Sequence, residues 1–113
     1  MEIKSPWTMV WSEFIEDFIS FIKGNLPPKH ELQSHELYPG IKINGEPIFI
    51  VDDDTTGKRL LIDFKNKRRL GETNRKSPFI KIFESDDKIQ EMIEQDYQRE
   101  MKQYMETNAE QIH

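Results

Sequence analysis

Four carboxylates and a lysine on two neighbouring predicted strands are the residues of this sequence best suited to chemistry. The run Asp52-Asp53-Asp54 ends one apolar strand, and Asp63 and Lys65 lie two residues apart at the end of the next. Because alternate residues of a strand project from the same face, Asp63 and Lys65 share a face of the expected sheet. Carboxylates can hold Mg²⁺, and a lysine can orient a water for attack on a phosphodiester. The arrangement makes a metal-dependent nuclease one candidate function.

The spacing of these residues resembles that of the PD-(D/E)XK nuclease superfamily. The resemblance covers residues 48–66, and it implies that Asp52 is the first metal ligand, Asp63 the second and Lys65 the base that orients water. The fold of that superfamily also needs an amphipathic crossover helix after the lysine strand. Residues 66–77 offer one apolar residue and a glycine, which do not suit a helix packed on a sheet. The nuclease is therefore the alternative function and not the preferred one.

A basic segment around the end of the same strand suggests direct binding of nucleic acid as a second alternative. Its basic side chains from the strand end onward are Lys65, Lys67, Arg68, Arg69, Arg75 and Lys76. Phosphate groups suit such a cluster. Phe64 is the one aromatic residue of the segment, and it alternates inward with Leu60 and Ile62. Exposed aromatic side chains on which bases could stack are therefore not expected here.

Length and composition predict one small domain. A chain of 113 residues is long enough to build a core without disulfides. Cysteine is absent, which excludes thiolate nucleophiles and cysteine zinc sites and fits a reducing compartment. The longest apolar run, Ile48–Val51, is far shorter than the roughly 20 residues that span a bilayer. We expect a cytoplasmic protein with no membrane partner, no cofactor and no metal.

Charge is distributed unevenly along the chain, whose formal net charge is −5. Residues 1–57 carry 10 acidic and 4 basic side chains, residues 58–84 carry 3 and 9, and residues 85–113 carry 8 and 3. The basic middle either neutralises the acidic ends on the folded surface or meets an anionic partner. The acidic total argues against general affinity for nucleic acid, because domains with that affinity are usually basic.

A first helix is predicted from Ser5 and Pro6, which suit a helix start, to Gly24-Asn25, which suit its end. Apolar residues follow one another between them at helical spacing. They are Trp7, Val10, Trp11, Phe14, Ile15, Phe18, Phe21 and Ile22. They cover about half of the helix surface, which is more than one contact with a sheet requires. Trp7 and Trp11 could therefore belong to the core or to a partner interface.

Strands and a last helix are predicted in the rest of the chain. The expected strands are Ile41–Ile43, Pro47–Val51, Arg59–Phe64 and Pro78–Phe83. Asn44-Gly45 and Asp54–Gly57 have the composition of tight turns. A helix begins at Ser85 or Asp86, where Asp86 and Asp87 complement the positive end of its dipole.

The predicted order of elements is an N-terminal helix, three or four antiparallel strands in a meander, and a C-terminal helix packed on the sheet. This order is typical of the α+β class. Both helices could cover one face of the sheet, or each could cover its own face. Apolar residues almost vanish after Met105. Residues 1–105 are therefore expected to form a single domain, and residues 106–113 a frayed polar tail.

The preferred interpretation is a small acidic protein without catalytic activity that binds a protein partner. Carboxylates along the last helix suggest an inhibitor or adaptor, for example one that occupies the basic groove of a nucleic-acid-processing enzyme. The residues expected to contact the partner are Trp7, Trp11, Glu91, Glu94, Asp96 and Glu100. The composition suits a bacterial or phage accessory protein, and a homodimer is a further arrangement that the sequence leaves open.

Overall fold

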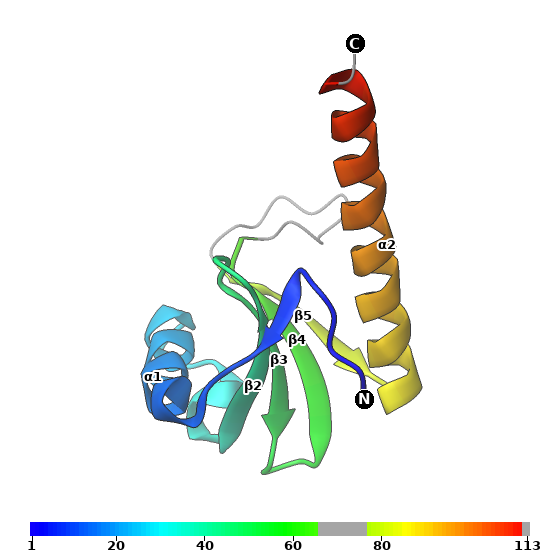
Figure 1. The fold of residues 1–113 in the computed structure, drawn as a ribbon. Helices are drawn as coiled ribbons and strands as arrows, with labels where there is room; N and C mark the ends of the chain where they lie inside the picture. Colours follow the sequence, from blue (N-terminus) through cyan, green and yellow to red (C-terminus); the bar gives the residue numbers. More distant parts are fainter. Residues whose placement is uncertain (66–76, 112–113) are drawn as a thin grey trace.

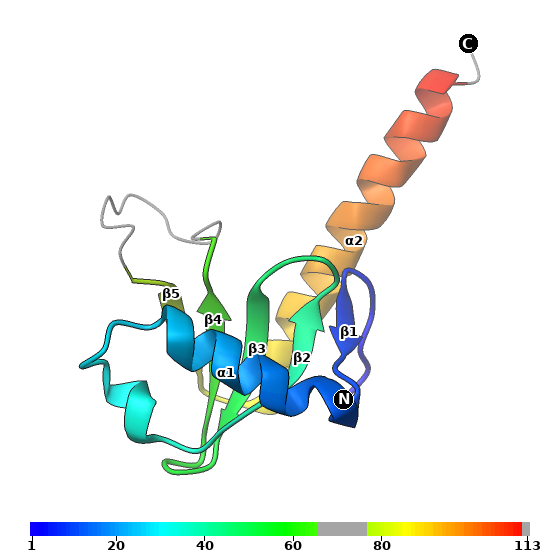
Figure 2. The ribbon, with the colours of Figure 1, turned by 90° about the vertical axis from the view of Figure 1, so that its left-hand side faces the viewer.

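A five-stranded antiparallel sheet lies between two helices in the computed structural model of the chain (Figure 1). The structure describes residues 1–65 and 77–111, the last five of them by their backbone alone. The strand order is β1-β2-β3-β4-β5, so each strand pairs with its neighbour in sequence. Helix α1 covers one face of the sheet and helix α2 the other (Figures 1 and 2). The predicted α+β class is confirmed, with five strands in place of three or four.

The described elements alternate with short turns. The strands are β1 Trp7–Met9, β2 Leu37–Ile43, β3 Ile48–Asp53, β4 Lys58–Asp63 and β5 Phe79–Phe83. The helices are α1 Ile15–Asn25 and α2 Asp86–Gln111, with 3-10 turns η1 Ser12–Phe14 and η2 Glu31–Ser34. Gly45 and Gly57 have φ angles of 75° and 76°, in the two turns that the sequence predicts. Glycine adopts this left-handed conformation without the steric cost that a Cβ atom brings.

The helix predicted from Ser5 and Pro6 to Gly24-Asn25 is wrong in its first half. Trp7–Met9 instead form β1, which pairs antiparallel with the end of β2, and α1 begins only after the 3-10 turn η1. Thr8 and Val10 are β-branched and suit an extended backbone, so helical spacing of the neighbouring apolar residues was misleading. The Ser5–Pro6 peptide bond is cis, in the turn that precedes β1.

Each face of the sheet has its own apolar core. The core beneath α1 contains Ile22, Leu26, Leu32, Leu37, Phe49, Val51, Leu60 and Ile62. The core beneath α2 contains Trp7, Ile41, Ile43, Ile48, Ile50, Leu61, Phe83, Ile89 and Ile93. Successive side chains of β3 alternate between these two cores, which explains why its sequence is apolar without interruption.

Helix α2 crosses its face of the sheet and then projects beyond it (Figures 1 and 2). Ile89 and Ile93 are fully buried in the first half, whereas Tyr104 and Met105 in the outer half are exposed. The helix continues to Gln111, past the end of the apolar stripe at Met105. Neither described helix is both long enough and apolar enough to cross a membrane.

Candidate functional site

The two carboxylates considered as metal ligands lie near opposite ends of the β3–β4 pair. Asp52 pairs in register with Arg59, and Asp63 lies four residues further along β4, opposite Ile48. Four residues of a strand span about 13 Å, whereas the oxygen ligands of one Mg²⁺ or Ca²⁺ ion lie within about 2.6 Å of it. The carboxylate of Asp52 instead accepts a hydrogen bond from Arg59 Nε–H, at 2.8 Å. The structure therefore does not bring the two ligands together.

Lys65, the third residue of that set, has a different carboxylate as its partner. Its Nζ atom lies 2.9 Å from Glu46 Oε2. Asp63 accepts a hydrogen bond from the backbone N–H of Lys65, at 2.9 Å, and is itself fully buried. In residues 1–65 and 77–111, no group of three or more histidine or acidic side chains is arranged to hold a metal ion.

Most of the basic segment lies outside the described residues. Lys65 is its one described member. The others, which stay predictions, are Lys67, Arg68, Arg69, Arg75 and Lys76.

Trp7 and Asp96, two of the residues expected to contact a partner, are buried and bonded to each other. The indole Nε1–H of Trp7 donates to Asp96 Oδ2 at 2.8 Å, and the two residues are 3% and 6% exposed. This bond connects β1 to the middle of α2. A partner that docks on the folded surface reaches neither side chain, so their position indicates a structural role instead.

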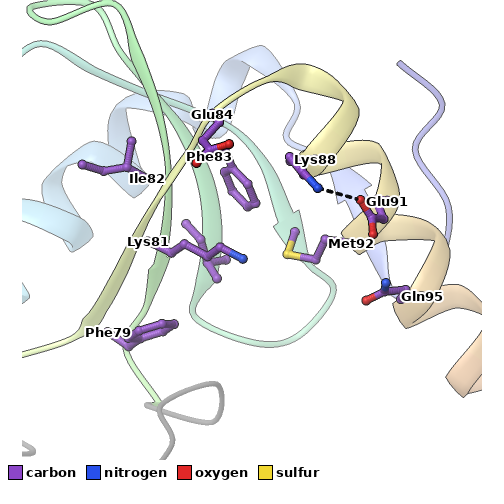
Figure 3. A pocket seen from close by; sticks show the side chains of 10 residues that line it. Phe79, Lys81, Ile82, Phe83, Glu84, Lys88, Glu91, Met92 and Gln95 are labelled. Carbon is purple, nitrogen blue, oxygen red and sulfur yellow. Dashed lines mark ion pairs between the residues drawn. The ribbon is translucent and has the colours of Figure 1, made fainter.

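The other four residues of that set are accessible, and their surroundings differ. Glu94 and Glu100 bind the N-terminal segment, because Glu94 pairs with Lys4 and Glu100 accepts from Ser5 Oγ at 2.8 Å. The hydrogen bond from Lys4 to Glu94 raises the pKa of Lys4. Glu91 lies three residues before Glu94 on α2 and lines a groove beside β5 (Figure 3). Trp11 is 75% exposed beside the start of α1.

Buried Asp53 and partly buried His35 form a pair beside the β3–β4 turn, and no sequence pattern indicated it. His35 Nδ1 lies 2.7 Å from Asp53 Oδ2, and Asp53 Oδ1 accepts from the backbone N–H of Thr55 at 3.1 Å. Burial alone would raise the pKa of Asp53, but hydrogen bonds from His35, Thr56 and Thr55 outweigh it and hold the pKa below its usual range. His35 directly follows η2, so the pair connects the β3–β4 turn to the segment between η2 and β2. Asp53 is only 2% exposed, which favours a structural role over a site for chemistry.

A groove of about 580 Å³ runs between β5 and the first half of α2 (Figure 3). Its apolar lining includes Leu61, Phe79, Phe83 and Met92, and its charged lining Lys81, Glu84, Lys88 and Glu91. Figure 3 shows Lys81 and Phe83 directed from β5 toward α2, with Ile82 on the other side of the strand. A groove that combines apolar side chains with a few charged ones can bind an apolar chain and orient it.

Lys81 is the charged side chain of the groove that lacks an acidic partner in the described part of the chain. Its Nζ atom lies 5.6 Å from the centre of the Phe83 ring, in a cation–π contact. No ion pair joins it to a described carboxylate, whereas Lys88 Nζ lies 3.5 Å from Glu91 Oε2. Among the described residues, the groove therefore presents an unpaired positive charge at Lys81 on β5 and an unpaired negative charge at Glu84, just after the end of the strand.

The outer edge of β5 borders this groove, and no described strand pairs with it. Phe64 N–H donates to Pro47 O at 3.1 Å, so even-numbered residues of β4 bond to β3 and odd-numbered ones face β5. In the β4–β5 register, odd-numbered residues pair with odd-numbered residues. The N–H and C=O groups of Ile80 and Ile82 consequently point away from the sheet. Sequence reasoning identified the strand, but it could not show that this strand ends the sheet.

Comparison with known proteins found no match among protein-family models, curated proteins or solved structures. The function is therefore inferred from the groove and the strand edge beside it.

Proposed function

We propose that this protein is a non-catalytic interaction module that binds a protein partner in the groove between β5 and α2. The observation that supports this function is the position of the groove, directly beside main-chain groups of Ile80 and Ile82 that point away from the sheet. An open strand edge is a template for pairing with another chain. Peptide-binding domains use such an edge for affinity and an adjacent groove for specificity.

The side chains at this edge also favour association. Ile82 is 55% exposed and Phe79 and Ile80 are partly buried, so a partner would remove apolar surface from water. Burying one isoleucine side chain contributes roughly 1.5–3 kcal/mol. In this function the protein acts as an adaptor or inhibitor of its partner. The absence of cysteine supports a setting in the cytoplasm.

Selection of peptide ligands by phage display tests the proposal with a matched pair of variants. Gln95→Trp places a large side chain in the groove, whereas Gln98→Trp places one at an exposed position of α2 that does not line it. Peptides selected on the wild-type protein should bind Gln98→Trp normally and should bind Gln95→Trp at least about tenfold more weakly. Equal binding to all three proteins, or no selected peptide, would contradict the proposal.

No second function is proposed, because the described residues favour none. Asp52 is held by Arg59, and Lys65 lies against Glu46, so the nuclease alternative lacks a convergent set of ligands among them.

A further inference from the structure

We infer that the ligand of the groove is an extended strand that adds antiparallel to β5, with an acidic side chain opposite Lys81 and an apolar side chain on either side of it. This inference rests on the proposed function and names the chemistry of the partner segment. It follows from the hydrogen-bonding pattern of the edge, the charge of the groove and the sequence of β5.

The hydrogen-bonding pattern determines the register of the added strand. Every pair of strands in the sheet is antiparallel, and the outward main-chain groups belong to Ile80 and Ile82. An antiparallel strand would exchange two hydrogen bonds with each of these residues. The residue opposite Lys81 then forms a pair without hydrogen bonds, in which the two Cα atoms lie only about 4.5 Å apart. Side chains in such a pair are in close contact.

The charge of Lys81 determines which kind of ligand residue is favoured opposite it. Lys81 points toward α2 and has no carboxylate partner among the described residues (Figure 3). Glu91 is paired with Lys88, and Glu84 follows the end of β5. Opposite charges in a cross-strand pair stabilise it, and like charges destabilise it. A glutamate or aspartate opposite Lys81 is therefore favoured over a lysine or arginine.

The two neighbouring positions of the ligand would be apolar. They lie opposite Ile80 and Ile82, whose side chains are on the α1 side of the sheet. Ile82 is 55% exposed, so a side chain that covers it removes apolar surface from water. β-Branched residues suit a cross-strand contact of this kind. The favoured core of the ligand is thus apolar, acidic, apolar.

The sequence of β5 disfavours a second copy of the chain as the occupant. Phe79 to Phe83 reads Phe-Ile-Lys-Ile-Phe, which is the same in both directions. Two antiparallel copies centred on each other would place Lys81 opposite Lys81 of the second copy, in the close pair. The resulting repulsion disfavours this dimer and leaves the edge to a strand of opposite charge.

Synthetic peptides titrated into the ¹⁵N-labelled full chain test the inference by NMR. The probe is a blocked nine-residue peptide, Ser-Gln-Thr-Val-Glu-Val-Thr-Gln-Ser. One matched peptide has lysine in place of the glutamate, and another has both valine amides N-methylated. The glutamate peptide should shift the amide signals of residues 80–82 and bind about fivefold more tightly than the lysine peptide. The N-methylated peptide should not bind, because it cannot donate its hydrogen bonds to β5.

Variants of the protein distinguish a role of Lys81 from a general effect of charge. Lys81→Glu should reverse the preference between the two peptides, and Lys81→Gln should remove it. Lys102→Glu, which changes an exposed lysine on the outer half of α2, should leave the preference as it is in the wild type. The spectrum of each variant reports whether it is folded, and Lys81→Gln keeps the test valid if the charge reversal is not tolerated.

The outcomes separate this inference from the proposed function. Binding that is insensitive to the central charge, or to Lys81→Gln, would contradict the acidic strand. Groove-binding peptides selected by display that lack an acidic residue at the centre would contradict it as well, while the proposed function would stand. If neither the designed nor the selected peptides bound at the groove, both would be wrong.

Discussion

At the scale of single residues, Asp53 shows how a carboxylate stays charged when it is buried. Its two oxygen atoms face His35 Nδ1 and the N–H groups of the β3–β4 turn, so each oxygen has a hydrogen-bond partner. Glu31 lies 3.9 Å from the other ring nitrogen of His35. The pKa of Asp53 is therefore lower in the folded chain than in the unfolded chain, where it is about 3.9.

Asp53→Asn should lower the free energy of unfolding at pH 7 by about 1–3 kcal/mol. The amide oxygen can still accept from the turn, but the charge facing His35 is lost. The charged form stabilises the fold fully above pH 4 or so, and this contribution disappears as the pH falls through the lower pKa of the folded state. Urea denaturation should therefore show a difference between wild type and variant that shrinks in acid. Asp54→Asn, at an exposed neighbour, is the control, and a difference independent of pH would contradict the mechanism.

The same substitution should have a large effect on stability at one tryptophan and almost none at the other. Trp7→Phe removes the donor to buried Asp96 and should cost about 1–3 kcal/mol of stability, whereas exposed Trp11→Phe should change it by less than about 0.5 kcal/mol. Acrylamide should quench the fluorescence of Trp11, which remains in the first variant, far more than that of Trp7, which remains in the second. Equal quenching would show that Trp7 is not in the interior.

At the scale of elements, the sequence predicts those parts of the fold that depend on local patterns. The turns at Gly45 and Gly57 follow from residues that adopt φ > 0, and α2 follows from its acidic first turn. Strand β1 could not be predicted in this way. The apolar residues Trp7, Val10 and Trp11, which lie in the strand and directly after it, have a spacing that also suits a helix. Only the pairing of β1 with β2, a contact between distant residues, decides between the two.

The candidate site was harder to predict than the fold for a related reason. The sequence Phe-Ile-Lys-Ile-Phe indicates a strand, but an edge depends on the order of all the strands. The groove depends on where α2 crosses the sheet, which no local pattern specifies. Asp63 and Lys65 were candidate site residues because of their spacing. Spacing along one strand does not determine which residues of the rest of the structure each side chain contacts.

Alanine at two glycines should change stability in opposite directions. Gly57 has a φ of 76°, so a Cβ atom there is strained, and Gly57→Ala should cost about 1–2 kcal/mol. Gly24 lies inside α1, with no atom within 4 Å of where a Cβ would stand, so Gly24→Ala should gain up to about 1 kcal/mol. Thermal denaturation followed by circular dichroism measures both. A destabilising Gly24→Ala would mean that this end of α1 is not helical in solution.

At the scale of the whole molecule, the chain combines an acidic total charge with a lysine at an apolar strand edge. A charged side chain on an edge strand is a common means of preventing association between sheets. Lys81 would serve this purpose in the free protein and would select an acidic segment in the complex. Solubility and specificity would then depend on the same residue.

Lys81→Val should make the protein associate with itself through β5. Without the two opposed lysines, the symmetric strand becomes a continuous apolar edge that can pair with its own copy. Sedimentation equilibrium should show a monomer for the wild type and a dimer or larger species for the variant as concentration rises. Lys102→Val, which removes an exposed lysine elsewhere, should stay monomeric; if it associates as well, loss of charge alone is responsible.

The succession of strands in the sheet has a consequence for the order in which the molecule forms. Strands β2 to β5 pair with their neighbours in sequence, so that part of the sheet can assemble while the chain is still being synthesised. The bonds of the N-terminal segment to α2, among them Glu2 to Gln90 and Ser5 to Glu100, join residues 88 to 95 positions apart. The sheet face beneath α2 therefore stays exposed to water until α2 has been synthesised. Glu2 and Ser5 can form their bonds to α2 only after Gln90 and Glu100 have been added to the chain.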